Sequence, residues 1–220
     1  MDETETPTSV QEHYFVASEL ARLGVQWVSL APRYTGRFEK GVDYIGDLEL
    51  FDAELAKDAA IARALGPYKL SIHSGSDKFR VYPSFARHGR ELVHLKTAGT
   101  SYLEGLRAVA GVNAELFRQI LGFARQRYDQ DRATYHVSAN LGRVARPEDL
   151  ADEELEGVLD QFDGREVLHV TFGSVVERFG DRLLATLAEH EEAYYAALET
   201  HFERHLMPFL PSAHVDDGGL

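Results

Sequence analysis

The chain has 220 residues, of which 44% are hydrophobic and 27% are charged, a balance typical of one globular domain. Its 36 acidic and 23 basic residues give a formal net charge of −13, which argues against a nucleic-acid partner and against an anionic membrane surface. The absence of cysteine excludes disulfides and thiolate metal sites, and the lack of a long apolar run or a signal-peptide pattern leads us to expect a cytoplasmic protein.

The predicted elements alternate between helices and short apolar strands. The first helix begins after Ser9, which is spaced from Glu12 as in a capping box, and it ends at Gly24. A strand over 26–31 follows, and a long polar segment over 33–47 comes next. The later predicted elements are helices over 48–65, from 102 onward, over 115–128 and over 178–206, a short acidic helix ending near Phe162, and strands over 68–73, 92–96, 133–138 and 167–172.

Strands separated by helices pair in parallel, which suits either a (β/α)8 barrel or an open doubly wound sheet. The phosphate-loop and dinucleotide glycine motifs are absent, which favours the barrel. A complete barrel needs about 250 residues, and the opening Met1-Asp2-Glu3-Thr4 has the composition expected just after a strand that lies upstream. We therefore predict an α/β, TIM-barrel-like fold, with residues 1–210 as the C-terminal part of one barrel domain and 211–220 as a flexible tail.

Polar side chains gather where the predicted strands end, and these ends carry function in parallel α/β folds. They are Arg33, His73, Ser74, Asp77, His94, Lys96, His136 and Ser138. One histidine alone is more often a hydrogen-bonded structural group than a ligand, but the repetition on three strands favours a site. The helical and tail histidines are expected at the surface: His13, His88, His190, His201, His205 and His214. His169 is expected inside the last strand as an interior polar group.

Imidazole and carboxylate groups without thiolates suit a catalytic divalent ion that keeps open coordination positions. The candidate carboxylates are Asp2, Glu3, Glu39 and Asp43. A lone loop glutamate is normally solvated, but the length of the segment 33–47 favours a functional role for Glu39. The loops 74–78 and 96–101 offer hydroxyl, amide and ammonium groups that suit a carboxylated or polyhydroxylated substrate.

Five segments of the sequence resemble the tagaturonate/fructuronate epimerase family. They are Trp27–Arg33, Phe38–Asp47, Ser71–Phe79, His94–Glu104 and Phe172–Val175. The resemblance runs over essentially the whole chain, and it is to the C-terminal part of longer family members.

The resemblance implies a metal-dependent hexuronate ketose epimerase that interconverts D-tagaturonate and D-fructuronate in galacturonate catabolism. It implies that Glu39 and His73 hold a divalent cation and that Asp2 or Glu3 is an acid/base group, with a further ligand and a partner base upstream. The predicted substrate-binding residues are Arg33, Ser74, Asp77, Lys78, Lys96 and His136. Of these, the cationic side chains of Arg33, Lys78 and Lys96 are candidates to clamp the carboxylate of a sugar acid.

Two mechanisms stay open at this point: proton abstraction through an enediolate, and a retro-aldol route assisted by Lys96. Two alternative functions stay open as well. One is another metal-dependent sugar isomerase or aldolase on the same barrel, and the other is an inactive or split fragment that acts only with a partner chain. Part of a barrel exposes sheet edges and an apolar face, so we expect a homo-oligomer or a missing N-terminal half as partner.

Overall fold

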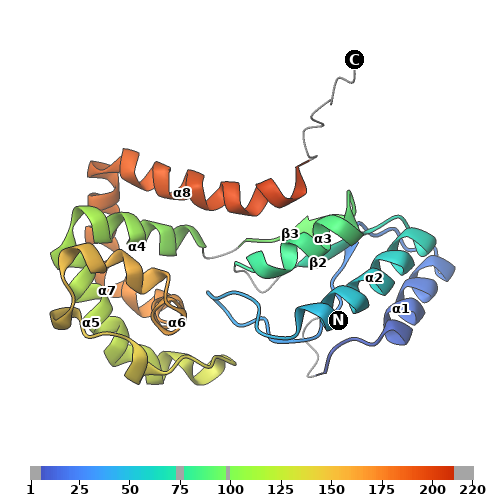
Figure 1. Ribbon diagram of the computed structural model, residues 1–220, viewed down its shortest axis with the longest axis horizontal. Helices are drawn as coiled ribbons and strands as arrows, with labels where there is room; N and C mark the ends of the chain where they lie inside the picture. Colours follow the sequence, from blue (N-terminus) through green and yellow to red (C-terminus); the bar gives the residue numbers. More distant parts are fainter. Residues whose placement is uncertain (1–5, 73–76, 98–99, 211–220) are drawn as a thin grey trace, which may run out of the picture.

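The fold divides into two lobes, each with its own hydrophobic core (Figure 1). The computed structural model describes residues 6–72, 77–97 and 100–210. Residues 6–72 and 77–97 form the α/β lobe, and residues 100–206 form the helical lobe. Among the described helices, none combines the length and the apolar character that crossing a membrane would require.

The α/β lobe is a parallel three-stranded sheet covered by helices. Its strands are β1 (Ser29–Leu30), β2 (Lys69–Ile72) and β3 (Val93–Leu95), in the order β1-β2-β3. Its helices are α1 (Val10–Arg22), α2 (Leu48–Leu65) and α3 (Tyr82–Gly89). The three strands pair in parallel and alternate with the helices along the chain, so the prediction of an α/β fold is confirmed.

Local signals fix the helix boundaries of the α/β lobe. The predicted capping box is present at α1, where the Glu12 amide donates to Ser9 Oγ and the Glu12 carboxylate accepts from the Ser9 amide. Asp47 caps α2 by accepting from the amides of Glu49 and Leu50 at 2.9 and 3.1 Å. Gly66 ends α2 where the sequence predicts its end.

The helical lobe packs five helices around an aliphatic core. They are α4 (Thr100–Val112), α5 (Ala114–Asp131), α6 (Phe162–Val170), α7 (Phe172–Glu189) and α8 (Glu191–Leu206). Short 3-10 turns occupy much of 132–159. In Figure 1, α8 runs along the top from the helical lobe to the α/β lobe, and Phe209 after it packs on Tyr82 of α3. The last helix therefore links the two lobes.

Two predicted strands are wrong. Residues 167–170 belong to α6, and Phe172 begins α7 after Thr171. Buried residues of α6 recur at helical spacing: Asp163, Glu166, Val167 and Val170. A short apolar run has no periodicity of its own that separates a buried strand from a buried helix. Residues 133–138 form a 3-10 turn and then an irregular segment, in which Tyr135 is 40% exposed.

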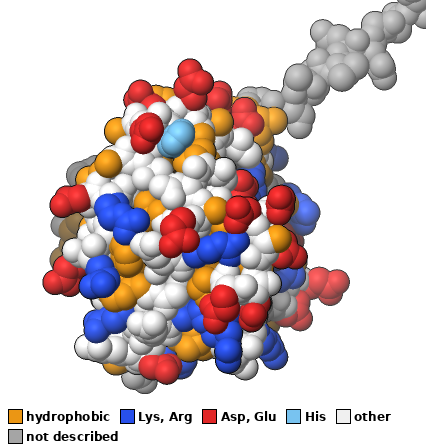
Figure 2. Space-filling model, turned by 90° about the vertical axis from the view of Figure 1, so that its left-hand side faces the viewer, with side chains coloured by type: hydrophobic (Ala, Val, Ile, Leu, Met, Phe, Trp, Pro, Cys, Tyr) orange, Lys and Arg blue, Asp and Glu red, His pale blue; other side chains and the backbone are white. Residues whose placement is uncertain are grey.

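Two helix predictions also need correction. The short acidic helix expected to end near Phe162 is a pair of 3-10 turns, and an α-helix begins at Phe162 instead. The single tail helix expected over 178–206 is two helices that meet at His190, which has φ −120° and ψ 45°. Figure 2 shows the end of the molecule formed by the helical lobe, where acidic and basic side chains are interspersed with small apolar areas.

Candidate functional site

A layer of polar and ionisable side chains, most of them buried, lies between the two hydrophobic cores. We call it the interlobe polar layer; it consists of Glu39, Asp77, Lys78, Glu104, Arg165, Glu166, His201 and His205. The loops after β1 and β2 supply the first three members, α4 and α6 supply the next three, and α8 supplies the two histidines. Polar side chains thus lie after the carboxyl ends of β1 and β2, and the roles predicted for them stay predictions.

Glu39 and Glu166 form a buried carboxyl pair joined by the backbone of residues 138–139. The amide of Ser138 donates to Glu39 Oε2 at 2.9 Å and to Glu166 Oε2 at 3.1 Å, and the Ser138 hydroxyl donates to Glu39 Oε2 at 2.7 Å. Glu166 Oε2 also accepts from the amide of Ala139 at 2.5 Å. Two carboxyl groups in one buried place cannot both be charged without a large cost.

The pKa of Glu166 is raised to about 7, first by burial and then by the charge of Glu39 and the hydrogen bond between the two groups. The amides of Ala139 and Ser138 act in the opposite direction. A carboxyl group with a pKa near neutrality can both take up and release a proton under physiological conditions, which is what general acid/base catalysis needs.

Lys78 fixes the loop that carries Glu39. Its ammonium group is fully buried and donates to the carbonyl oxygens of Glu39 at 2.9 Å and Val42 at 2.6 Å. Burial lowers the pKa of Lys78 to about 8, although nearby carboxylates, with Asp43 and Asp77 foremost, act to raise it. The same loop turns at Gly41, where φ is +78° and an added Cβ would lie 2.6 Å from the Cβ of His169. The glycine thus allows the loop to approach α6 closely.

Asp77 joins both lobes through Arg165. The guanidinium of Arg165 contacts Asp77 Oδ2, approaches Glu104 Oε1 at 3.4 Å and donates to the Gly41 carbonyl at 2.8 Å. Burial raises the pKa of Asp77, but the adjacent imidazoles of His201 and His205, each 3.2 Å away, and the charge of Arg165 outweigh it, so the pKa lies far below its usual range. Asp77 is therefore ionised.

Three ring and carboxylate atoms of this layer converge on one point. Asp77 Oδ1 lies 3.2 Å from Nε2 of His201 and 3.2 Å from Nε2 of His205, and the two Nε2 atoms are 3.0 Å apart. All three residues are at most 3% exposed. Such a group could hold a metal ion.

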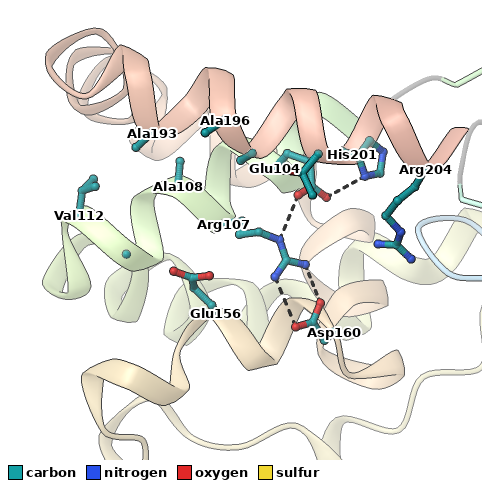
Figure 3. Close-up of a pocket in the computed structure, with 13 residues that line it drawn as sticks. Glu104, Arg107, Ala108, Val112, Glu156, Asp160, Ala193, Ala196, His201 and Arg204 are labelled. Atoms are coloured by element: carbon teal, nitrogen blue, oxygen red, sulfur yellow. Dashed lines mark hydrogen bonds and ion pairs between the residues drawn. The ribbon is translucent and has the colours of Figure 1, made fainter. Parts of the chain in front are cut away.

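Two cavities lined by described residues border the polar layer. The smaller one, about 240 Å³, lies between the lobes and is lined by Asp43, Asp77, Arg165 and Arg204 among others. The larger one, about 520 Å³, lies between α4 and α8 and is drawn in Figure 3. There His201 and Arg107 both contact Glu104, and Arg107 also pairs with Asp160 at 2.7 Å. The small side chains of Ala108, Ala193 and Ala196 leave the rest of this groove open.

The other predicted site residues lie outside the interlobe polar layer or outside the described residues. Asp2, Glu3, His73 and Ser74 lie outside the described residues. Lys96 is exposed after β3, and His136 is exposed in the irregular segment. Arg33 is half-buried, and its backbone exchanges two hydrogen bonds with Thr8. Asp43 is a turn group that accepts from the amides of Tyr44 and Arg80. The roles predicted for these residues stay predictions.

The surface prediction is wrong for three histidines. His13 is fully buried between Asp58 and Tyr68, at 2.7 Å from each, and His201 and His205 are buried in the polar layer. His169 lies on α6, and burial, together with the charges of Arg165, Lys40 and Lys78, lowers its pKa to about 4. Its Nδ1 atom has no hydrogen-bond partner within the described part of the chain.

Sequence reasoning did not identify Glu104, Arg165 or Glu166. Glu104 lies on a helix that was not assigned to the site, and Arg165 and Glu166 directly precede the run that was predicted as a strand. No predicted strand end therefore indicated these three residues. One signal for the histidine pair does exist in the sequence: His201 and His205 are four residues apart, which places them on one face of a helix.

Comparisons with known proteins agree on one family. The family description "tagaturonate epimerase" matches residues 1–209. A curated "Tagaturonate/fructuronate epimerase" of Thermotoga maritima is 47% identical over 208 residues, which are 94% of this chain and 43% of that protein.

Solved structures of a "fructuronate-tagaturonate epimerase" from Cohnella laeviribosi give the same picture. The native structure is 43% identical with a TM-score of 0.92, over 95% of this chain and 44% of that one. A complex with one glycerol is 44% identical with a TM-score of 0.91, over 94% and 44% of the two chains. The chain thus spans less than half the length of these relatives.

Proposed function

The chain belongs to the tagaturonate epimerase family, and we propose that it supplies part of the active site of an enzyme that interconverts D-tagaturonate and D-fructuronate. The observation that carries the proposal is the Glu39–Glu166 pair, a buried acid/base group beside the loops that follow β1 and β2. Inverting a carbinol of a keto sugar acid requires a group that exchanges a proton near neutral pH.

Within this pair, Glu166 is the group that gives and takes the proton. Its raised pKa keeps it between its two protonation states near pH 7, and the amides of Ser138 and Ala139 hold its carboxyl group in place. Ser138 presents two donors to Glu39 and orients that carboxylate as well. Both the proton-abstraction route and the retro-aldol route can use such a group.

We further propose that Glu39 and His73 help to hold a catalytic divalent cation, as the family resemblance implies. Of the two, Glu39 lies among the described residues, and it fits this role because it is a buried carboxylate whose Oε2 atom is oriented by Ser138. When bound, such an ion polarises a carbonyl group and stabilises a developing oxyanion. Lys78 holds the loop of Glu39 through two carbonyl oxygens and so positions the ligand.

The sheet supports a barrel assignment for the whole enzyme. Strands in the order β1-β2-β3, with helices between them, are what three consecutive units of a (β/α)8 barrel present. Among the described strands β1 pairs only with β2, and Val28 beside it is 75% exposed. We propose that a further strand of the enzyme pairs with this edge.

A chimera tests the proposal. In it, this chain replaces the matched 43% of the Thermotoga maritima protein, and D-tagaturonate is followed by NMR in deuterated water. We expect D-fructuronate to form, and Glu39→Gln or Glu166→Gln to slow the reaction by at least about 100-fold. Glu199→Gln, at an exposed position of α8, is the matched control.

The outcomes are distinct. A folded chimera without turnover would overturn the proposal, and full activity of Glu166→Gln would remove that residue from the reaction. Deuterium at the inverted carbon indicates proton transfer with solvent exchange, whereas inversion without deuterium favours the retro-aldol route.

A further inference from the structure

We propose that Asp77, His201 and His205 form a second divalent-cation site, separate from the one proposed at Glu39, which joins α8 to the loop after β2. The three atoms that face one another are 3.0, 3.2 and 3.2 Å apart. Bonds of about 2.0–2.2 Å from zinc to nitrogen and oxygen place tetrahedral ligands roughly 3.3–3.6 Å apart. The triangle is therefore close to one face of a zinc-type coordination shell.

The outer sides of the two rings indicate which nitrogens carry protons. Nδ1 of His205 lies 2.7 Å from the Tyr82 hydroxyl, and Nδ1 of His201 lies 3.3 Å from Glu104 Oε1. The Glu104 carboxylate can only accept a hydrogen bond, and the Tyr82 hydroxyl can accept one as well as donate one. Both contacts are therefore compatible with the tautomer that carries hydrogen on Nδ1 and leaves a lone pair on each Nε2. This is the arrangement in which metal-binding histidines are usually held by outer partners.

Without a cation, this tautomer leaves the two Nε2 atoms and Asp77 Oδ1 without hydrogen-bond donors. Two nitrogen lone pairs and a carboxylate oxygen would then face one another within 3.2 Å. Asp77 is 3% exposed, and its Oδ1 atom lies 3.2 Å from both Nε2 atoms without meeting hydrogen-bond geometry toward any group in the described part of the chain. A cation would satisfy all three atoms at once, whereas a hydrogen between the two rings would leave the Asp77 oxygen without a bond.

The ligand set and its surroundings define the class of ion. Two imidazoles and one carboxylate, without sulfur, suit Zn²⁺, Co²⁺ or Mn²⁺ rather than calcium, which prefers oxygen ligands only. Asp77 lines the cavity of about 240 Å³ and His201 lines the cavity of about 520 Å³, so an ion and a water ligand can enter from either side. The ion would connect α8, which belongs to the helical lobe, with the α/β lobe.

Cobalt binding tests this site without reference to enzymatic activity. The 220-residue chain is stripped with a chelator and titrated with Co²⁺, whose visible absorption reports the coordination shell. We expect stoichiometric binding in wild type and also in Glu39→Gln, which alters only the other proposed site. His201→Gln and His205→Gln should weaken binding by at least about 100-fold, and Tyr82→Phe by about 10-fold.

His190→Gln is the matched control, because His190 immediately precedes α8 and lies outside the cluster. Absence of cobalt binding in wild type would overturn the proposal, and so would unchanged binding in both His201→Gln and His205→Gln. If those variants fail to fold, nitrogen NMR of the wild-type histidines decides: zinc should shift the Nε2 resonances of two rings, and an unchanged spectrum would overturn the site. Activity of the chimera depends on neither result, so this proposal and the epimerase proposal can fail separately.

Discussion

The hydrophobic cores of the two lobes are built from different kinds of side chain. The core of the α/β lobe is rich in aromatic residues, among them Tyr34, Tyr44, Phe51, Tyr68, Tyr82 and Phe85, whereas leucine, valine and alanine dominate the core of the helical lobe. A tyrosine ring is apolar in its body and polar at its tip, so an aromatic core can reach buried polar groups. Tyr82 does so at His205, and Tyr68 does so at His13.

The helical lobe, whose core is aliphatic, contributes charged side chains from a packed helix. It carries Arg165 and Glu166 on one short helix, α6, which lies between the 3-10 turns and α7 and has most of its residues buried. Charged groups on a well-packed helix are held in place by the core behind them. The difference teaches that the α/β lobe contributes loop residues to the interlobe polar layer, whereas the helical lobe contributes groups on packed helices that these loop residues contact.

The largest expected effect tests whether the two cores unfold together. Phe51→Ala in the α/β lobe and Phe117→Ala in the helical lobe should each lower the free energy of unfolding by about 4 kcal/mol, because each removes a fully buried ring. Trp27, the single tryptophan, packs on Tyr68 and reports the α/β lobe in urea denaturation, while far-UV circular dichroism reports all helices. We expect both probes to shift together in both variants. A Phe117→Ala protein whose Trp27 transition stays in place would show that the lobes unfold independently.

The next effect concerns the polar layer that couples the lobes. Arg165→Met should lower the free energy of unfolding by about 3 kcal/mol, because it leaves the buried carboxylates of Asp77 and Glu104 without their shared guanidinium. Arg178→Met, at an exposed position of α7, is the control and should cost under about 0.5 kcal/mol. Equal losses in the two variants, measured by urea denaturation, would mean that the layer does not join the lobes.

The two lobes also differ in how far the sequence alone predicts them. In the α/β lobe, caps such as Asp47 and breakers such as Gly66 stand at the element boundaries, and the bounds of α2 follow from them. In the helical lobe, the run over 167–172 fits a strand or a helix equally well, and Gly173-Ser174 after it is typical of a turn but lies inside α7. A glycine therefore predicts an element boundary only where the hydrophobic pattern beside it is itself unambiguous.

The candidate site was likewise predictable in the α/β lobe and not in the helical lobe. Glu39 and Lys78 follow strands that the sequence identifies, so their proximity is a consequence of parallel pairing. Glu166 comes from a segment predicted as loop and strand, and only tertiary packing brings it next to Glu39. A buried partner contributed by a distant helix has no local signature in a single sequence.

A third prediction uses the raised pKa of Glu166. Because this pKa is about 7 in the folded state, against an ordinary value of 4.5, the folded protein keeps a proton that the unfolded chain loses between these values. The contribution of Glu166 to stability therefore falls as pH rises from 5 to 8, by about 2 kcal/mol. Glu166→Gln cannot lose a proton, so the stability of wild type relative to this variant should fall by that amount over the same range. Urea denaturation at both pH values measures it, and a difference that does not change with pH would contradict the raised pKa.

The smallest expected effect compares one helix cap from each lobe. Asp47 accepts two amide hydrogen bonds at the start of α2, at 2.9 and 3.1 Å, and Asn113 accepts one at the start of α5, at 3.1 Å. The carboxylate of Asp47 also interacts favourably with the positive end of the helix dipole. We therefore expect Asp47→Ala to cost about 1.5 kcal/mol and Asn113→Ala about 1 kcal/mol. Thermal unfolding at low salt measures both, and the gap should narrow in high salt because only the charged cap is screened. If the difference between the two free-energy losses does not change with salt, it comes from the second hydrogen bond of Asp47 and not from its charge.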